Sequence, residues 1–489
     1  MRAPLRLLAL QSLLGGAFIA CLTMCGGAPV RAQTATSALP APLEAAITRS
    51  RLPREAFALL VADADGPVSA SPRLAYRAQA EMNPASVMKL VTTFAALDLL
   101  GPAYQWTTQI ALDGRVEAGV LKGNLVIQGG GDPKLVVERL WLLLARVRSL
   151  GVRQVTGDIV LDASAFEPLP TRPGDFDDQP LRAYNAAPDA LLINFKAVVL
   201  TFSPDAAAGV ARVHLDPPLA DVQRPSEVPL APAGSDCGDW RASLRADFSD
   251  PTRIRLGGTY PVVCGEKLWA LAYADPSSHA RRAVEGMWRE MGGQVAGQVR
   301  ARRPDERAPA GAPVLSFASP PLAELVRDIN KFSNNVMAQQ VFLTLSPNRP
   351  ASFAQARARL GLWWTERLPG FKAPVLENGS GLSRDERITA QSLAGLLRLA
   401  WQSALMPDFA ASLPLAGVDG TLRRSNARAA HLKTGSLRDV AAIAGYVDAA
   451  QGQRRIVVGL VNHPNAAAGR QVLDALALWA SEAGTGAQP

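Results

Sequence analysis

The sequence is poor in the residues that hold metal ions and disulfide frameworks. It has four cysteines and four histidines among 489 residues. Neither a His-Glu-x-x-His motif nor a pair of Cys-x-x-Cys motifs occurs, and no ligand spacing relates the four histidines, which are His214, His279, His431 and His463. The sequence therefore argues against a zinc enzyme, and we expect neither a metal nor a cofactor.

Other absences narrow the protein class further. The chain carries 51 Lys and Arg against 43 Asp and Glu, but these charges are spread along it, so nucleic-acid binding gains little support. No fixed-period repeat is visible, which argues against solenoids and propellers. Hydrophobic residues make up 48% and charged residues 19%, which excludes a disordered or collagen-like chain and provides for a sizeable core.

Residues 1–32 have the pattern of a secretory signal peptide. Arg2 and Arg6 precede an apolar run over 7–25, and small residues up to Ala32 precede a cleavage site. We therefore expect export to the periplasm. A retained membrane anchor is the alternative, although the apolar run is short. Cys21 loosely resembles a lipoprotein site, but the hydrophobic residues after it argue against cleavage there. Beyond this region, no segment is long and apolar enough to span a bilayer.

Removal of residues 1–32 would leave two cysteines, Cys237 and Cys264. With no other cysteine to compete, one disulfide is expected in an oxidising compartment, worth about 3–4 kcal/mol on the loop-entropy model. Two reduced thiols are the alternative.

Hydrophobic periodicity predicts secondary structure at both ends of the chain. The N-terminal part predicts a helix over 43–50, a strand over 56–66 and a helix that begins after Pro84 and ends at Gly101. The C-terminal part predicts a final helix over 470–482, preceded by an antiparallel meander of three strands over 430–437, 440–450 and 454–462. Residues 123–163 read as strand, helix and strand, and 195–275 are rich in strands and turns.

The first motif with chemical content is Ser86-Val87-Met88-Lys89. A spacing of three residues on a helix places a hydroxyl and an amine on one face, where the amine can take the proton of a nucleophilic serine. The position near a helix N-terminus also favours stabilisation of an oxyanion. For Lys89 to act as a base at neutral pH, its pKa must fall from about 10.4 to near 7, through burial or a second nearby cation. Alone, the motif is weak evidence for a nucleophilic serine.

The second motif is Lys433-Thr434-Gly435, followed by Ser436, on a predicted strand. An edge strand can pair with an extended peptide, while the lysine and hydroxyls hold a carboxylate. Gly435 would leave room for close approach of the substrate backbone. An exposed strand end with a turn glycine is the alternative.

The third motif is Ser333-Asn334-Asn335, inside a helical-looking segment. Ser333 and Asn335 can face one site only from a loop or a broken helical turn. Alone this motif is no evidence for a functional site. Its position along the chain, between the other two motifs, is the informative feature. The succession Ser-x-x-Lys, Ser-x-Asn, Lys-Thr-Gly is the set typical of penicillin-binding proteins and class A β-lactamases.

At this point the chain resembles the D-alanyl-D-alanine carboxypeptidase/endopeptidase family, the class C or penicillin-binding protein 4 type of low-molecular-mass penicillin-binding proteins. The resemblance also rests on residues 83–108, 123–135, 377–389, 414–425 and 432–449. It implies a mixed α/β fold, in which a β-lactamase/transpeptidase-like domain with an antiparallel sheet flanked by helices is interrupted by two inserted smaller domains. We expect the catalytic domain over 40–108 and 306–489 and the inserted domains over 109–305.

The resemblance implies roles for the motif residues. Ser86 would attack the carbonyl between two terminal D-alanines of a stem peptide, with Lys89 as general base. Ser333 and Asn335 would relay the proton and hold the substrate amide. The substrate-binding residues would be Lys433, Thr434, Gly435, Ser436 and Asp162: the lysine and threonine grip the terminal carboxylate, Ser436 shares an oxyanion hole with Ser86, and Asp162 recognises the third stem residue. Penicillins would acylate the same serine.

Alternatives stay open at this stage. A β-lactamase or esterase of the same fold, or a non-catalytic wall-binding protein, would share much of this pattern. Peptidoglycan and β-lactams are the expected partners, and the sequence leaves peripheral membrane association and homodimer formation open. We interpret His431 as a surface or packed residue, Trp363 and Trp364 as packing residues, and Gly129–Asp132 as a loop turn rather than a phosphate loop, because no Gly-Lys-Ser/Thr follows.

Overall fold

The computed structural model describes residues 39–67, 70–169, 172–306, 312–425, 429–449 and 452–482. The predicted signal peptide, residues 1–32, lies outside the described residues. Within them, no helix has the length and hydrophobicity needed to cross a membrane.

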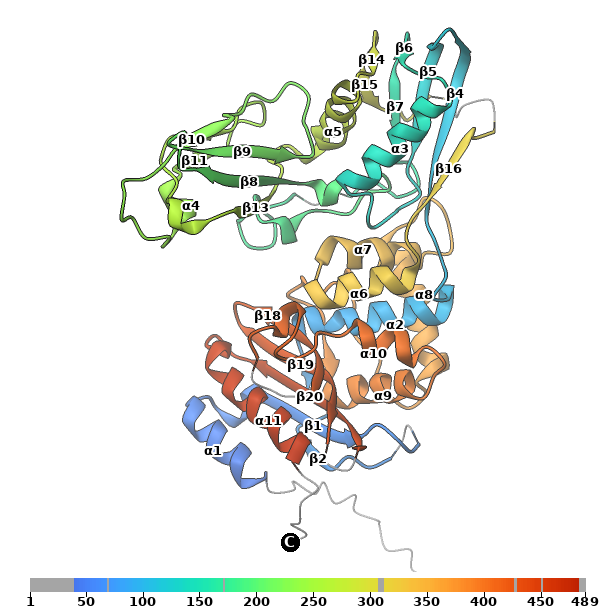
Figure 1. Ribbon diagram of the computed structural model, residues 1–489. Coiled ribbons are helices and arrows are strands. Elements are labelled where there is room, and N and C mark those ends of the chain that lie inside the picture. Colours follow the sequence, from blue (N-terminus) through green and yellow to red (C-terminus); the bar gives the residue numbers. More distant parts are fainter. Residues whose placement is uncertain are drawn as a thin grey trace, which may run out of the picture. The chain divides into compact units, whose positions relative to one another are not determined.

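Segments from both ends of the described chain form one five-stranded antiparallel sheet (Figure 1). In spatial order its strands are β18 (Ala430–Leu437), β19 (Val440–Asp448), β20 (Arg454–Asn462), β1 (Phe57–Asp63) and β2 (Leu74–Tyr76). The predicted C-terminal meander is confirmed, and the predicted N-terminal strand pairs with its last strand, Leu59 opposite Gly459. The strand that carries the Lys-Thr-Gly motif, β18, lies at the edge of the sheet.

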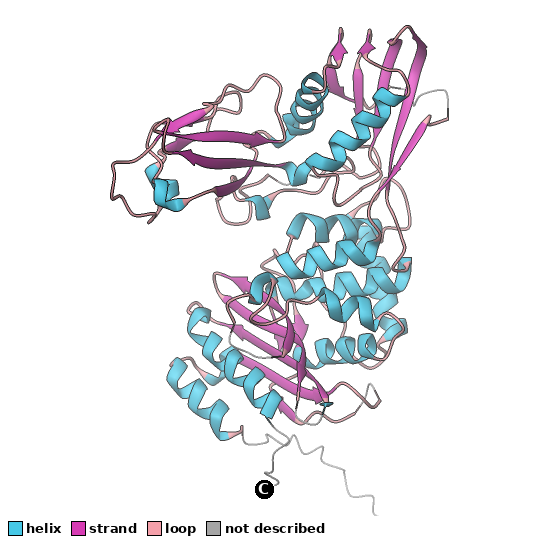
Figure 2. Cartoon of the chain, in the orientation of Figure 1, coloured by secondary structure: helices cyan, strands magenta, loops and turns pink. Residues whose placement is uncertain are grey.

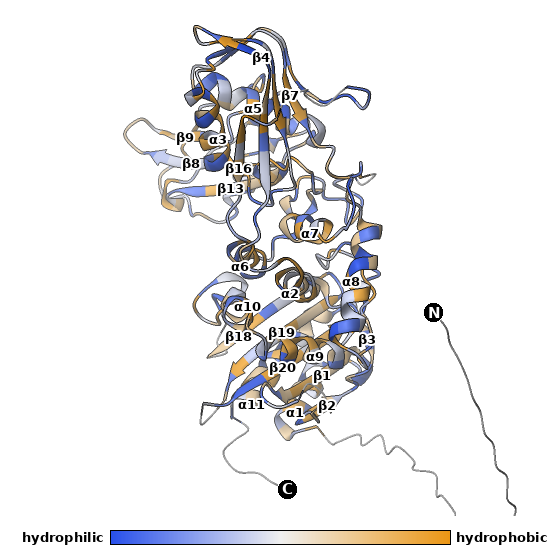
Figure 3. Cartoon of the chain, turned by 90° about the vertical axis from the view of Figure 1, so that its right-hand side faces the viewer, coloured by the Kyte–Doolittle hydropathy of each residue, from blue (hydrophilic) through white to orange (hydrophobic). Residues whose placement is uncertain are grey.

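Both faces of this sheet are buried because apolar residues fill both sets of alternating positions. On β1, Ala58 and Leu60 join one core cluster, while Phe57, Leu59 and Val61 join the other. Helices cover each face (Figure 2). Figure 3 shows hydrophobic colouring along the central strands and along helix α2 (Lys89–Leu100). The two-layer burial makes the sheet a rigid base for the residues at its edge.

The two faces carry different sets of helices. Helices α1 (Ala41–Ser50) and α11 (Arg470–Glu482) pack on the face of Leu59. The opposite face carries α2, α6 (Leu322–Phe332), α7 (Asn335–Thr344), α8 (Phe353–Arg367), α9 (Ala390–Trp401) and α10 (Met406–Ser412). A short ladder joins β3 (Glu81–Met82) to β17 (Ile388–Thr389). Helix α2 ends at Gly101, as predicted, where φ is +82°.

A second sheet has its own core. It contains β4 (Thr107–Glu117), β5 (Val120–Gln128), β6 (Gln154–Val155), β7 (Ile159–Asp162), β14 (Gln294–Val295), β15 (Val299–Ala301) and β16 (Leu315–Ala318). Helices α3 (Val137–Ser149) and α5 (Pro276–Glu290) share its apolar cluster. Residues 123–163 form strand, helix and strand, as predicted. Because β16 pairs with β4, this sheet includes residues on both sides of the predicted insertion, 109–305.

A third unit is built on β8 (Ala197–Asp205), β9 (Val210–Asp216), β10 (Glu227–Pro229) and β13 (Lys267–Ala272). It also holds the pair β11 (Ala246–Asp247) and β12 (Arg255–Leu256) and the short helix α4 (Trp240–Ser243). Its core is separate from the other clusters. Cys237 and Cys264, the two cysteines expected to pair, form a disulfide in this unit.

Candidate active site

Ser86 and Lys89 lie where a short 3-10 turn, η2 (Ala85–Met88), leads into helix α2. The sequence predicted an α-helix from Ser86 onward. The structure differs, because Ser86 lies in the 3-10 turn and the α-helix begins only at Lys89. Because a 3-10 helix has three residues per turn, side chains at i and i+3 are eclipsed. Lys89 Nζ consequently lies 3.0 Å from Ser86 Oγ. The turn is entered through Ala85, whose φ is +46°.

Lys89 is buried, with an exposed fraction of 0%, and its amine has three partners. Besides Ser86 Oγ, Nζ contacts Asn335 Oδ1 at 2.6 Å and the Ser380 carbonyl at 2.5 Å. Burial, together with the positive charge of Lys433, lowers the pKa of Lys89 well below its ordinary value, while the charge of Glu386 opposes this shift. The amine thus has the environment that favours a neutral base.

Ser333 and Asn335 reach the same place through a break between two helices. Helix α6 ends at Phe332, Ser333 adopts a left-handed φ of +56°, and the Asn334 side chain caps helix α7 by accepting from Met337 N at 3.1 Å. This is the broken helical turn that the Ser-x-Asn spacing requires. Asn335 Nδ2 also donates to the Tyr184 carbonyl at 3.1 Å, so a loop from the middle of the chain touches the site.

Lys433 brings the third motif into contact with the second. Its side chain is buried, and Nζ donates to Ser333 Oγ at 2.9 Å and to the Thr434 carbonyl at 2.7 Å. Burial lowers the pKa of Lys433 to about 7. The hydroxyl of Thr434 donates to Thr421 Oγ1 at 2.8 Å. The three motifs are therefore joined by side-chain contacts across 347 positions of sequence.

Gly435 permits a close approach, but to the protein's own backbone. A Cβ atom at Gly435 would lie 2.4 Å from the Pro84 carbonyl oxygen and 3.2 Å from Ala85 Cβ. Strand β18 is thus pressed against the turn that holds the nucleophile, and close approach of the substrate backbone to Gly435 stays a prediction. The next residue, Ser436, is exposed, and Arg470 Nη2 donates to its hydroxyl at 3.5 Å.

Sequence reasoning missed the functional content of the loop over residues 377–386, which we call the 377–386 loop. Its Ser380 carbonyl contacts Lys89, and its buried Glu386 binds three backbone amides of the loop. The sequence singled out this stretch only as a point of family resemblance. An acid placed after a Gly-Ser-Gly turn was the available signal, because such turns leave amides that a carboxylate can accept.

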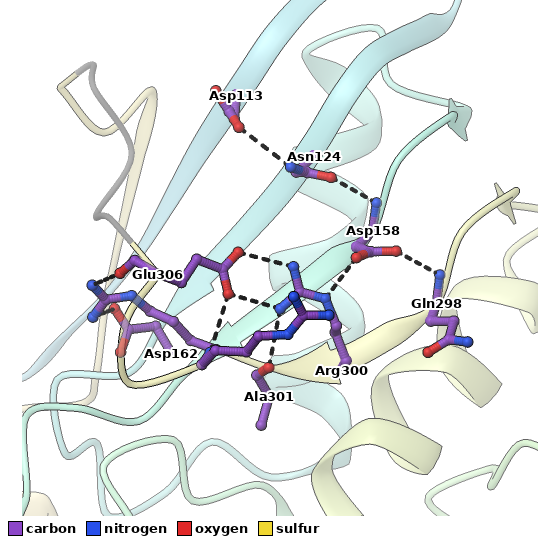
Figure 4. A network of polar contacts seen from close by, with 10 residues as sticks. Asp113, Asn124, Asp158, Asp162, Gln298, Arg300, Ala301 and Glu306 are labelled. Atoms are coloured by element: carbon purple, nitrogen blue, oxygen red, sulfur yellow. Dashed lines mark hydrogen bonds and ion pairs between the residues drawn. The ribbon is translucent and has the colours of Figure 1, made fainter.

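The structure does not bring Asp162 into this cluster. Its side chain is 1% exposed and lies on β7, in the second sheet. Figure 4 shows it near the network of Arg300 and Glu306. Its carboxylate partners are the Ser164 amide at 2.9 Å, Gln128 Nε2 at 3.3 Å and Arg302 Nη1 at 3.4 Å. The carboxylate is therefore held within the second sheet, and its role in recognising the third stem residue stays a prediction.

Other interpretations from the sequence agree with the structure. Trp363 and Trp364 are each 1% exposed within the main core cluster. Their indole N–H groups donate to Asp98 Oδ2 and to the Phe371 carbonyl. Residues 129–132 form a loop, and His431 is half-buried on β18.

The arrangement provides what acyl transfer to serine needs. A hydroxyl lies within hydrogen-bond distance of a buried amine, and a second buried amine is joined to it through Ser333 and Asn335. Strand β18 is the edge strand of its sheet; residues 414–416 pair with its first half, and the part that carries Thr434 and Ser436 lies beyond that pairing. An extended peptide can add to a sheet at such an edge.

Comparisons with known proteins agree with this chemistry. D-alanyl-D-alanine carboxypeptidase DacB of Haemophilus influenzae is 24% identical over 404 residues, which cover 79% of this chain and 82% of the relative. D-alanyl-D-alanine carboxypeptidase of Actinomadura sp. (strain R39) is 28% identical over 434 residues, covering 82% and 77%.

Solved structures show the same fold. The crystal structure of penicillin binding protein 4 from Haemophilus influenzae aligns with a TM-score of 0.68 at 22% identity, covering 89% of this chain and 97% of that one. A structure of the same protein complexed with a β-lactam gives 0.65 at 22% identity, covering 89% and 98%. The mixed α/β fold predicted from the sequence is therefore confirmed.

One family model spans the whole of the described chain. The model of the D-Ala-D-Ala carboxypeptidase 3 (S13) family matches residues 39–483. That range contains all three motifs. It also contains β19 and β1, the two strands on either side of β20 in the five-stranded sheet. With its serine, its buried lysines and this match, the chain belongs to the D-Ala-D-Ala carboxypeptidase 3 (S13) family of serine hydrolases.

Proposed function

We propose that this protein cleaves the bond between the two terminal D-alanines of peptidoglycan stem peptides through an acyl-enzyme on Ser86. The observation that carries the proposal is the 3.0 Å contact between Ser86 Oγ and the buried Lys89 Nζ. A serine hydroxyl becomes a nucleophile when an adjacent base takes its proton. Lys89 is placed for that step, and its lowered pKa favours the free amine that a base requires.

The contacts of Lys89 support a specific orientation of that base. A neutral amine has two N–H donors and one lone pair. Asn335 Oδ1 and the Ser380 carbonyl can accept the two N–H groups, which leaves the lone pair for the hydroxyl proton of Ser86. As Ser86 Oγ attacks the carbonyl carbon, its proton passes to Lys89, and the backbone N–H groups of Ser86 and Ser436 would stabilise the oxyanion.

Ser333 and Lys433 are suited to the second half of acylation. Ser333 Oγ lies 2.9 Å from Lys433 Nζ, so the serine can pass a proton to the leaving amine while the charged lysine supports that transfer. The same ammonium, with Thr434, would grip the terminal carboxylate of the substrate. Water then hydrolyses the ester and regenerates Ser86.

Two finer activities belong to this proposal. Penicillins would acylate Ser86, because their strained amide resembles the D-Ala-D-Ala bond, and the complex of the Haemophilus influenzae relative with a β-lactam supports this. Endopeptidase cleavage of cross-links would use the same groups on a longer leaving group. We also propose a periplasmic location, supported by the signal-like residues 1–32 and by the disulfide. Membrane association and homodimer formation remain predictions.

A labelling experiment tests the proposal. The mature protein is incubated with fluorescent penicillin, and separately with cross-linked muropeptides whose products are mapped. We expect stable labelling and release of D-alanine, both lost in Ser86→Ala. Rapid turnover of penicillin would favour a β-lactamase. Labelling that persists in Ser86→Ala would remove the proposed nucleophile, and binding of muropeptides without any product would favour a non-catalytic wall-binding protein.

A further inference from the structure

The buried carboxylate of Glu386 organises the loop that touches Lys89. Its side chain is 0% exposed, and one oxygen, Oε1, accepts three backbone N–H groups, from Glu377 at 3.0 Å, Asn378 at 3.1 Å and Gly379 at 3.0 Å. Three donors that converge on one oxygen fix the path of consecutive residues far more firmly than a single contact does. Because Ser380 directly follows these three residues, the position of its backbone is fixed as well.

The 377–386 loop is also packed directly on the turn that holds the nucleophile. A Cβ atom at Gly381 would lie 1.9 Å from the Ala85 carbonyl oxygen and 2.7 Å from Ser86 N. Thr92 Oγ1, on helix α2, donates to the Gly379 carbonyl at 2.6 Å. The loop therefore contacts the nucleophile's turn and the helix of the base together, so its position is coupled to both.

The Ser380 carbonyl decides where the free amine of Lys89 points. It lies 2.5 Å from Nζ, and Asn335 Oδ1 lies 2.6 Å from the same atom. When these two oxygens hold both N–H groups of the neutral amine, the lone pair is directed at Ser86 Oγ. If the Ser380 carbonyl moves away, the amine is free to rotate, and the fraction of time in which its lone pair faces Ser86 falls.

We propose that Glu386 is a positioning residue for acylation, which holds the Ser380 carbonyl on Lys89 and thereby aims the base at Ser86. It touches neither the substrate nor the reacting atoms, and it acts through the backbone of the 377–386 loop. The inference rests on the proposed roles of Ser86 and Lys89. Burial raises the pKa of the Glu386 carboxyl, while the three backbone amides oppose that shift. In its charged form Glu386 has a second effect, because it raises the pKa of Lys89 against the opposing effects of burial and Lys433.

Two substitutions at Glu386 separate these effects. Glu386→Gln keeps an oxygen acceptor for the three amides but removes the charge, so the pKa of Lys89 falls and the rising limb of the pH–rate profile moves to lower pH. Glu386→Ala removes the acceptor, and the acylation rate at the plateau should fall by roughly 100-fold, the cost of a small misplacement of a catalytic group. KM for a D-Ala-D-Ala peptide should change much less than kcat in this variant.

The experiment measures the second-order rate of acylation by fluorescent penicillin from pH 5 to pH 9, with circular dichroism as a check on folding. Asp385→Asn is the matched control, because it removes an equal charge from the exposed neighbour and should reproduce the wild-type profile. If Glu386→Ala does not fold, Glu386→Asp carries the test, because its shorter side chain draws the acceptor away from the three amides while keeping the charge. Acylation at the wild-type rate in Glu386→Ala, or in Glu386→Asp where the alanine variant does not fold, would overturn the inference, and a Glu386→Gln profile that superimposes on the wild-type profile would remove the electrostatic effect on Lys89. A wild-type chain that is never labelled would instead overturn the proposed function.

Discussion

The burial of Lys433 predicts a strong dependence of substrate binding on pH. Its pKa is lowered to about 7, because the side chain has lost its water and an ammonium is unfavourable there. The charged fraction is then one half at pH 7, falls about fivefold by pH 8 and then about tenfold for each further pH unit, which corresponds to about 1.4 kcal/mol per unit. If the ammonium grips the terminal carboxylate, kcat/KM must fall by the same factor above pH 7.

The acidic side of the profile has a different cause. Lys89 must be neutral to take the proton of Ser86, so kcat/KM rises with pH until its amine is free, and the two lysines together produce a bell-shaped profile. In the complex, the bound carboxylate stabilises the charged form of Lys433. The falling limb of kcat should therefore lie at higher pH than the falling limb of kcat/KM.

The assay follows the release of D-alanine from an acylated D-Ala-D-Ala peptide between pH 6 and pH 9. The same peptide with a C-terminal amide in place of the carboxylate is the control, and we expect it to react slowly and to lack the falling limb. A kcat/KM that stays level from pH 7 to pH 9, or an equal decline for both peptides, would refute the assignment of Lys433 to the carboxylate.

Three further predictions concern named residues. Gly435→Ala introduces a Cβ atom 2.4 Å from a backbone carbonyl oxygen, so urea denaturation should show that the free energy of unfolding falls by about 1–3 kcal/mol. The control is Gly361→Ala on helix α8, where a Cβ atom would meet nothing within 4 Å, and there the free energy of unfolding should rise by about 0.5–1 kcal/mol. Ser333→Ala removes the acceptor of Lys433 Nζ, and stopped-flow acylation should slow by roughly 100-fold or more; an unchanged rate would exclude the relay. Cys264→Ser opens the disulfide and should lower the unfolding free energy by about 3–4 kcal/mol in the unit that contains it, measured by limited proteolysis.

Much of the fold was predictable because local signals agree with it. Helix α2 ends where Gly101 supplies a positive φ, and helix α11 spans the predicted residues, Arg470–Glu482. The C-terminal strands are apolar at nearly every position, as expected for a sheet buried on both faces. The broken turn at Ser333 followed from the two-residue spacing of the Ser-x-Asn motif.

The remaining features depend on contacts between distant segments. Nothing near Gly435 in the sequence indicates that Pro84 lies against it, and nothing near Glu386 indicates a lysine almost 300 residues earlier. The burial of Asp162 and its contact with Arg302 likewise depend on the packing of the second sheet, where β7 pairs with β15. Spacing within a motif is local information, whereas the partners of a buried charge are set by packing.

The most direct test of the central claim is to locate the acyl group. The protein is trapped with penicillin, digested, and analysed by tandem mass spectrometry. The account predicts one adduct, carried by Ser86, that is absent from Lys89→Met, whose buried side chain keeps the packing but has no base. An adduct on any other serine, or full acylation of Ser86 in Lys89→Met, would contradict it.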